Sequence, residues 1–189
     1  MRDQIAEYVV SLYRDIPMAV YEGLLSALCL GVVVIIACYG WKRGWRKIVG
    51  LLLAEYVFLI YCTTVIFRTT ADGNGHEYKP FWSYEAIKNG GEDLIAENIM
   101  NVAVFVPVGM MLGIVTQKTR KAQNNFRTRT ARIAPIIGVG LIISVSIETM
   151  QYFFHRGFAE TDDVMHNTLG CLIGYGLIGL IRKIIKITT

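Results

Sequence analysis

Residues 144–174 read SVSIETMQYFFHRGFAETDDVMHNTLGCLIG. An apolar run that carries Glu148 and Gln151 breaks at an acidic loop, and a second apolar run restarts at Asn167. On a helix, residues three or four apart share a face, so Glu148 and Gln151 lie together, as do Asp163 and Asn167. A carboxylate inside a hydrophobic span is costly to keep there, which makes it a hypothesis for a functional site. The stretch therefore predicts two membrane helices with polar groups at their mouth.

The composition extends this prediction to the whole chain. The 189 residues are 53% hydrophobic and 18% charged, and the mean hydropathy is +0.43. Soluble domains are less apolar and more charged. The apolar runs approach the roughly 20 residues that a helix needs to cross a bilayer. The expected fold is an all-α membrane protein, a bundle of about five transmembrane helices.

Hydropathy divides the chain into one N-terminal segment and one membrane domain. Residues 1–17 place Ile5, Tyr8, Leu12 and Ile16 on one stripe, which predicts an amphipathic helix lying at the membrane interface. Residues 18–189 form the transmembrane domain. Its expected spans are residues 18–39, 48–67, 98–116, 133–154 and 164–181.

The charges predict the orientation of these spans. If the N-terminus lies outside, residues 40–47, residues 117–132 and the C-terminal tail are cytoplasmic. They hold thirteen of the 19 Lys and Arg residues and no acid, whereas thirteen of the 15 acids fall on the outer side. Short cytoplasmic loops are enriched in Lys and Arg, so we expect the N-terminus outside and the C-terminus in the cytoplasm. The net charge of +4 is thus divided by side, which argues against a nucleic-acid partner.

This topology places the intramembrane polar residues in one layer of the outer half of the bilayer. We expect an outward-facing polar cleft between the third, fourth and fifth spans, with the acidic loop as its rim. The structural alternative is a hydrogen-bond network that only fixes the packing of the helices, each bond contributing below about 1 kcal/mol. The candidate ligand-binding residues are Asn101, Glu148, Gln151, Arg156, Glu160, Asp162, Asp163 and Asn167.

Cofactor and metal chemistry find little support in the sequence. His155 and His166 bracket three acids, a set that suits a divalent cation, but no zinc-type spacing is present and we expect neither a metal nor a cofactor. No nucleophile or phosphate-binding motif occurs either. The four cysteines all fall inside apolar runs and are interpreted as small buried hydrophobic residues rather than disulfides or metal ligands.

Two blocks of the chain resemble the VanZ-like family of small bacterial membrane proteins, which is named for a teicoplanin-resistance accessory factor. Residues 97–112, ENIMNVAVFVPVGMML, are similar to its N-x-x-x-F-x-P-x-G segment. Residues 144–175 are similar to its second block, S-x-x-I-E-x-x-Q followed by R-G-x-x-E-x-D-D-x-x-x-N-T-x-G-x-x-x-G-Y. Arg68 followed by Pro80 and Phe81 is similar to an outer-loop element of the family.

The resemblance implies a multi-pass protein of the plasma membrane of a Gram-positive-type bacterium, linked to glycopeptide resistance. We expect membrane lipids as neighbours. The first hypothesis is that the cleft binds the glycopeptide or the lipid-linked cell-wall precursor. The second is a membrane enzyme that modifies a lipid-linked envelope component, with Asp162 or Asp163 as general acid or base and Arg156 on a phosphate. The third is a structural or assembly partner.

Overall fold

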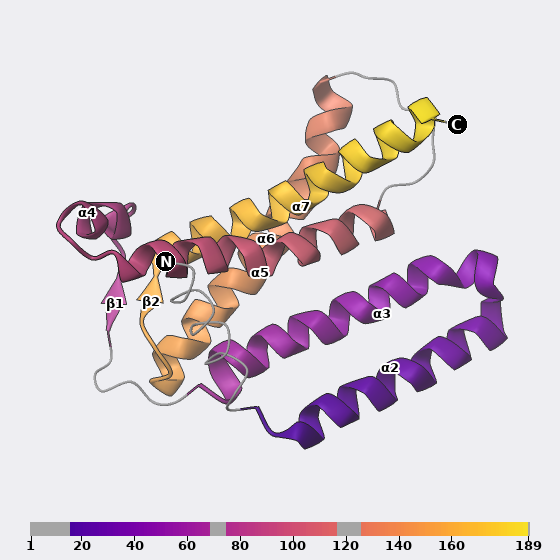
Figure 1. The fold of residues 1–189 in the computed structure, drawn as a ribbon, viewed down its shortest axis with the longest axis horizontal. Helices are drawn as coiled ribbons and strands as arrows, with labels where there is room; N and C mark the ends of the chain where they lie inside the picture. Colours follow the sequence, from indigo (N-terminus) through magenta and orange to yellow (C-terminus); the bar gives the residue numbers. More distant parts are fainter. Residues whose placement is uncertain (1–15, 69–74, 117–125, 189) are drawn as a thin grey trace.

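The chain folds into a bundle of long helices in the computed structural model, which describes residues 16–68, 75–116 and 126–188. The long helices are α2 (Met18–Tyr39), α3 (Trp41–Tyr61), α5 (Asp93–Thr116), α6 (Phe126–Phe154) and α7 (Thr161–Thr188). A single π-helical turn, η1 (Cys62–Ile66), continues α3. The short elements are α4 (Trp82–Lys88), β1 (His76–Glu77) and β2 (Ala159–Glu160), and all gather at one end of the bundle, which we call the α4 end (Figure 1).

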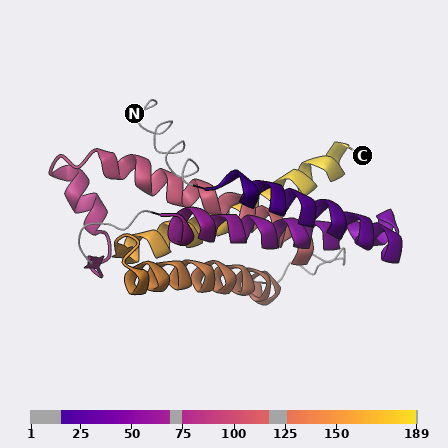
Figure 2. The same cartoon turned by 90° about the horizontal axis from the view of Figure 1, so that it is seen from below.

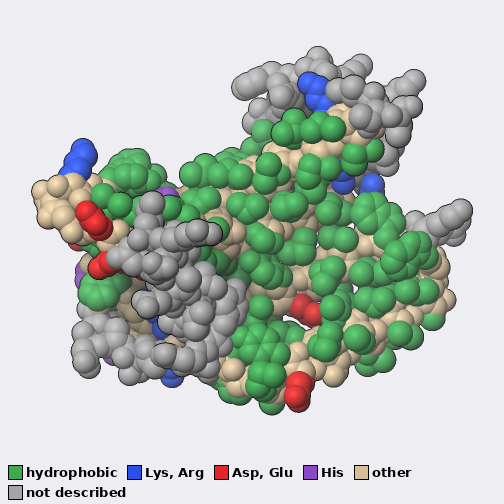
Figure 3. Space-filling model, in the orientation of Figure 1, with side chains coloured by type: hydrophobic (Ala, Val, Ile, Leu, Met, Phe, Trp, Pro, Cys, Tyr) green, Lys and Arg blue, Asp and Glu red, His purple; other side chains and the backbone are tan. Residues whose placement is uncertain are grey.

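Five helices of the described residues are long and apolar enough to cross a membrane, as the sequence predicts. Hydrophobic side chains cover most of the helix surface visible in Figure 3. The chain is therefore a multi-pass membrane protein. The predicted N-terminal amphipathic helix lies outside the described residues, and the orientation of the bundle remains a prediction from the charges.

Four spans begin earlier than the hydropathy suggests. Helix α3 starts at Trp41 rather than residue 48, and α6 starts at Phe126 rather than residue 133. Helix α5 starts at Asp93 rather than near residue 98, and α7 starts at Thr161 rather than residue 164. Both have aspartates in the first turn. A negative charge stabilises a helix N-terminus, so a polar first turn precedes the apolar part that hydropathy detects.

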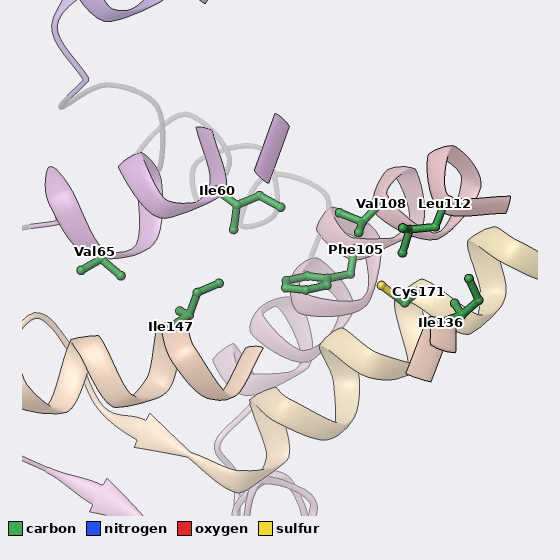
Figure 4. Close-up of a cluster of buried hydrophobic side chains, with 8 residues drawn as sticks. All are labelled: Ile60, Val65, Phe105, Val108, Leu112, Ile136, Ile147 and Cys171. Carbon is green, nitrogen blue, oxygen red and sulfur yellow. The ribbon is translucent and has the colours of Figure 1, made fainter. Parts of the chain in front are cut away.

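The core of the bundle lies between α3, α5, α6 and α7. Ile60, Phe105 and Ile147 come from three different helices and converge in Figure 4. Cys171 of α7 extends the same cluster and is fully buried. Burial of these apolar groups fixes the relative positions of the four helices.

The contact between α5 and α7 is the most extensive in the bundle. A Cβ atom at Gly170 would collide with the carbonyl oxygen of Val102, and one at Gly109 would collide with that of Cys171. Small residues at these positions let the two backbones touch.

Helix α2 packs along α3, and none of its residues is buried. Figure 2, turned by 90° from Figure 1, keeps it next to α3 at the margin of the molecule. Cys29 and Cys38 of α2 are therefore exposed, which corrects the expectation that every cysteine is buried. The correction arises because an apolar run predicts a span but not how many helices pack around it.

Strands β1 and β2 form a short parallel pair at the α4 end, which the predicted all-α fold did not include. His76 pairs with Ala159 and Glu77 with Glu160, and the Ala159 N–H donates to the carbonyl of Gly75 at 3.2 Å. The segment before α4 is thereby held against the turn between α6 and α7.

Candidate functional site

A small polar cavity lies near the α4 end, where α5, α6 and α7 meet η1. Its volume is about 40 Å³, which exceeds the roughly 15 Å³ that a cavity needs to hold one water molecule. Ile60, Phe105 and Ile147 form its apolar floor and belong to the hydrophobic core. Its polar lining consists of Thr63, Thr64, Arg68, Glu97, Asn101, Glu148, Gln151, Asp163 and Asn167.

Helices α5 and α7 contribute an amide and a carboxylate that face each other. The Asn101 Nδ2 donates to the Asp163 Oδ1 at 2.6 Å. One turn deeper, the Asn167 Nδ2 donates to the Ser144 Oγ of α6 at 2.9 Å. These bonds connect three helices within the polar layer, and they leave Asp163 and Asn167 lining the cavity.

Helix α6 contributes Glu148 and Gln151, which are 8% and 3% exposed. The Glu148 Oε2 accepts the backbone N–H of Glu160 at 2.9 Å, and the Gln151 Nε2 donates to the Thr64 carbonyl at 3.1 Å. Within the described residues, the Gln151 Oε1 has no hydrogen-bond partner. A buried acceptor without a donor is costly, so the cavity suits a ligand or water that donates a hydrogen bond.

The cation of the cavity, Arg68, is positioned by the turn between α6 and α7. The Arg156 Nη1 donates to the Arg68 carbonyl at 2.5 Å, which holds the backbone at that point. Gly157 has a φ of 137°, and a Cβ there would lie 2.9 Å from the Arg68 Cζ. Arg156 therefore holds the Arg68 backbone, and Gly157 leaves room for the Arg68 guanidinium. This guanidinium lies in the cavity with the carboxylates of Glu97, Glu148 and Asp163.

Asp162 does not line the cavity, because its side chain caps α4. Its Oδ1 accepts the Phe81 N–H at 2.6 Å, and its Oδ2 accepts the Ser83 N–H at 3.0 Å and the Ser83 Oγ at 2.6 Å. A carboxylate at a helix N-terminus satisfies donors that lack partners within the helix. Asp162 is 1% exposed, and its bonds fix α4 over the start of α7.

Glu160 lies in the loop between α6 and α7 and contacts both the cavity wall and α4. Its Oε2 accepts the Trp82 Nε1–H at 3.1 Å. The pKa of Glu160 is raised to about 7, mainly by burial and also by the charges of Glu97 and Asp162, while the Trp82 hydrogen bond and Arg68 oppose the shift. The carboxyl therefore changes its charge near neutral pH.

The structure brings five of the eight predicted site residues together. Asn101, Glu148, Gln151, Asp163 and Asn167 line the cavity, as expected from one polar layer. The other three support its surroundings and do not line it: Arg156, Glu160 and Asp162. That any of the eight binds a ligand remains a prediction.

Sequence reasoning missed several lining residues. Glu97 falls just outside the expected third span, which begins at residue 98, yet it lies four residues before Asn101 on α5 and lines the cavity. This i, i+4 spacing was the available signal. Arg68 was indicated only by its similarity to the outer-loop element. Thr63 and Thr64 lie in a π-helical turn that no sequence pattern predicted.

The remaining polar candidates do not form a metal site. Among the described residues, no group of three or more His, Cys, Asp and Glu side chains is arranged to hold a metal ion. The His166 Nε2 lies 2.8 Å from the Tyr84 hydroxyl instead. Glu55 of α3 is separate from the cavity, and within the described residues its buried Oε1 has no hydrogen-bond partner.

Comparisons with known proteins give one consistent result. The sequence model of the VanZ/LLP1 family matches residues 24–182. The chain is 31% identical over 87 residues to "Protein VanZ" of Enterococcus faecium, an alignment that covers 46% of this chain. It spans about half of that relative, 47% of its length. No solved structure matches the chain.

Proposed function

Because this chain belongs to the VanZ/LLP1 family, we propose that it contributes to resistance against teicoplanin-type glycopeptides by binding at its polar cavity. The ligand is the lipoglycopeptide itself or a lipid-linked cell-wall precursor. When the protein binds this ligand, less antibiotic is bound to the cell-wall target. The resistance link rests on the family. The binding role rests on the cavity.

The unpaired oxygen of Gln151 carries this proposal. It lies in a cavity where three carboxylates, Glu97, Glu148 and Asp163, face one guanidinium. Such a lining attracts a hydrogen-bond donor or a cation. A volume of about 40 Å³ admits only a small group of a large ligand. The rest of the ligand would lie over the α4 end, which the charge distribution predicts to face outward.

The enzyme hypothesis keeps Asp163 as a candidate acid or base at the cavity, but not Asp162. Asp162 and Asp163 are adjacent in sequence, but Asp162 caps α4 whereas Asp163 bonds Asn101. The two carboxylates therefore do not share one site. The structural hypothesis, in which the polar layer only joins helices, is the alternative that an experiment must separate from binding.

Teicoplanin susceptibility of a sensitive Gram-positive host tests the proposal. The host expresses the wild type, Glu148→Gln, Asp163→Asn or Glu55→Gln, and membrane levels of each protein are measured in parallel. Glu55→Gln is the matched control, because it removes the charge of a half-buried carboxylate that does not line the cavity.

We expect the two cavity variants to lose most of the protection at unchanged protein level, whereas the control keeps it. Saturable binding of teicoplanin or precursor to the purified protein in nanodiscs should weaken about tenfold, the effect of one lost charge-assisted hydrogen bond. Protection lost only in step with folded protein would support the structural hypothesis. A wild type that gives no protection would refute the proposal.

A further inference from the structure

A second hollow opens beside the cavity, on the side of α6 that faces away from the core. This groove has a volume of about 270 Å³ and lies between α6, the start of α7 and the segment after β1. Glu148 lines both the groove and the cavity. A ligand in the groove would therefore reach the same carboxylate from the lipid side.

The polarity of the groove changes along the helix axis. Tyr152 and Glu160 line the part nearest the α4 end, and Glu148 lies one turn deeper on α6. Val145 lies a further turn along α6, and Val164 lines the groove from the first turn of α7. Tyr152 and Val145 are seven residues apart, about 10 Å at helical rise. An amphiphile that lies along the membrane normal has the same order, with a polar head outside and an apolar chain inside.

The lipid-facing surface of α6 continues below the groove without polar side chains. Val145 is 49% exposed, and Ile142, one turn further from the α4 end, is 71% exposed. A chain that leaves the groove therefore meets apolar surface. The volume of the groove lies near the lower end of ligand pockets, which are roughly 300–1,000 Å³. It suits a head group and one chain rather than an entire antibiotic.

The charge of the groove selects the head group. Its described lining contains the carboxylates of Glu148 and Glu160 and neither lysine nor arginine. The Glu160 N–H holds the Glu148 Oε2 at 2.9 Å, so the two acids lie close together. Carboxylates accept hydrogen bonds and attract an ammonium group, whereas they repel a phosphate.

We infer that the groove binds a single-chain amphiphile with an amine-bearing head, taken up from the outer leaflet. The ammonium contacts Glu148 and Glu160, and the chain passes Val145 and Val164. This inference deepens the proposed function, on which it rests, because it favours the amine-bearing ligand over the phosphate-bearing precursor. It also assigns the groove as the path by which that ligand meets the cavity carboxylate.

Photolabelling of the full chain in phosphatidylcholine nanodiscs tests the inference. The probes are dodecylamine and dodecyl phosphate, each with the same photoactivatable group on the chain, and labelled peptides are located by mass spectrometry. The variants are Val145→Trp, which fills the groove, and Ile142→Trp, a matched control on exposed surface outside it. Glu160→Gln provides a second variant that leaves the volume unchanged.

We expect saturable labelling around Val145 and Val164 by the amine, at least fivefold above that by the phosphate. Val145→Trp should lower this labelling about fivefold, and Ile142→Trp should not. Glu160→Gln should reduce the preference for the amine. Equal labelling by both probes, or labelling that survives Val145→Trp in correctly folded protein, would overturn the inference.

Two further arms complete the test. Nanodiscs that contain phosphatidylethanolamine should label equally well, because two chains do not fit; suppressed labelling would contradict the assignment of a single-chain ligand. If labelling fails while Glu148→Gln still abolishes resistance, the groove is refuted and the proposed function stands. If labelling succeeds while the wild type gives no resistance, the groove stands and the proposed function is refuted.

Discussion

At the scale of single residues, Glu160 is the group whose charge is most open to control. Its backbone N–H donates a hydrogen bond to the Glu148 carboxylate, and its own carboxylate accepts one from the Trp82 indole N–H. Burial raises its pKa to about 7. Near neutral pH, protonation of Glu160 would therefore change the charge of the groove.

Substituting Glu160→Gln should change how stability depends on pH. An ordinary glutamate has a pKa near 4.5, whereas folded Glu160 has one of about 7. Between these values the folded state binds more protons than the unfolded state, so the free energy of unfolding falls as pH rises. The loss of stability that ionised Glu160 causes in the wild type is absent below pH 4.5 and complete above pH 7. In thermal denaturation in detergent, the melting temperature of Glu160→Gln should rise by a few degrees relative to that of the wild type between pH 5 and pH 8.

The control for this measurement is Glu92→Gln, which changes an exposed acid near the same end. Its melting temperature should follow the wild type across the range. A Glu160→Gln curve parallel to that of the wild type would show that the carboxyl titrates at its ordinary pKa.

The same residues show what a sequence can predict about a site. The spacing of Glu148, Gln151, Asp163 and Asn167 was enough to place them in one layer, because two helical faces with a common end leave little freedom. The separation of Asp162 from Asp163 could not be predicted. Adjacent helical residues point roughly 100° apart, and which neighbour each meets depends on α4, whose position follows from tertiary contacts.

At the scale of helices, the contact between α5 and α7 carries the site. The contact has glycines at positions 109, 113, 170 and 174, where atoms of the partner helix leave little or no room for a Cβ. The paired backbones keep Asn101 within hydrogen-bond reach of Asp163. Helix ends were harder to predict, since a polar first turn carries no hydropathy signal.

Gly170→Ala should destabilise the protein, whereas Gly176→Ala should not. A Cβ at Gly170 meets the Val102 backbone, while the space around Gly176 on the same helix is open. We expect Gly170→Ala to lower the free energy of unfolding by about 1–3 kcal/mol through overpacking. Gly176→Ala should be neutral or stabilising by up to about 1 kcal/mol, because alanine favours the helix. Thermal denaturation in detergent measures both, and equal effects would contradict the close contact.

At the scale of the whole molecule, the cavity and groove have the proposed role only if the α4 end faces outward. The segregation of charge along the chain predicts this orientation. Single cysteines in a cysteine-free background test it in intact cells, with a thiol reagent that does not cross membranes. Exposed positions are available at both ends of the bundle, Glu92 near α4 and Lys183 near the end of α7.

We expect Glu92→Cys to react in intact cells and Lys183→Cys to react only after permeabilisation. Both variants should react equally in detergent, which serves as the control for accessibility. The reverse pattern would place the cavity on the cytoplasmic side and exclude direct access of an external antibiotic.

The marginal position of α2 has a consequence for how this chain tolerates mutation. Its side chains meet α3 or the bilayer, and none is buried. Exchanging one apolar residue for another in α2 alters neither the cavity nor the groove, because these side chains need only remain apolar. In α5, α6 and α7 the same exchanges alter shape at close contacts. Random mutagenesis should therefore recover active clones with many changes in the first span and few in the last three.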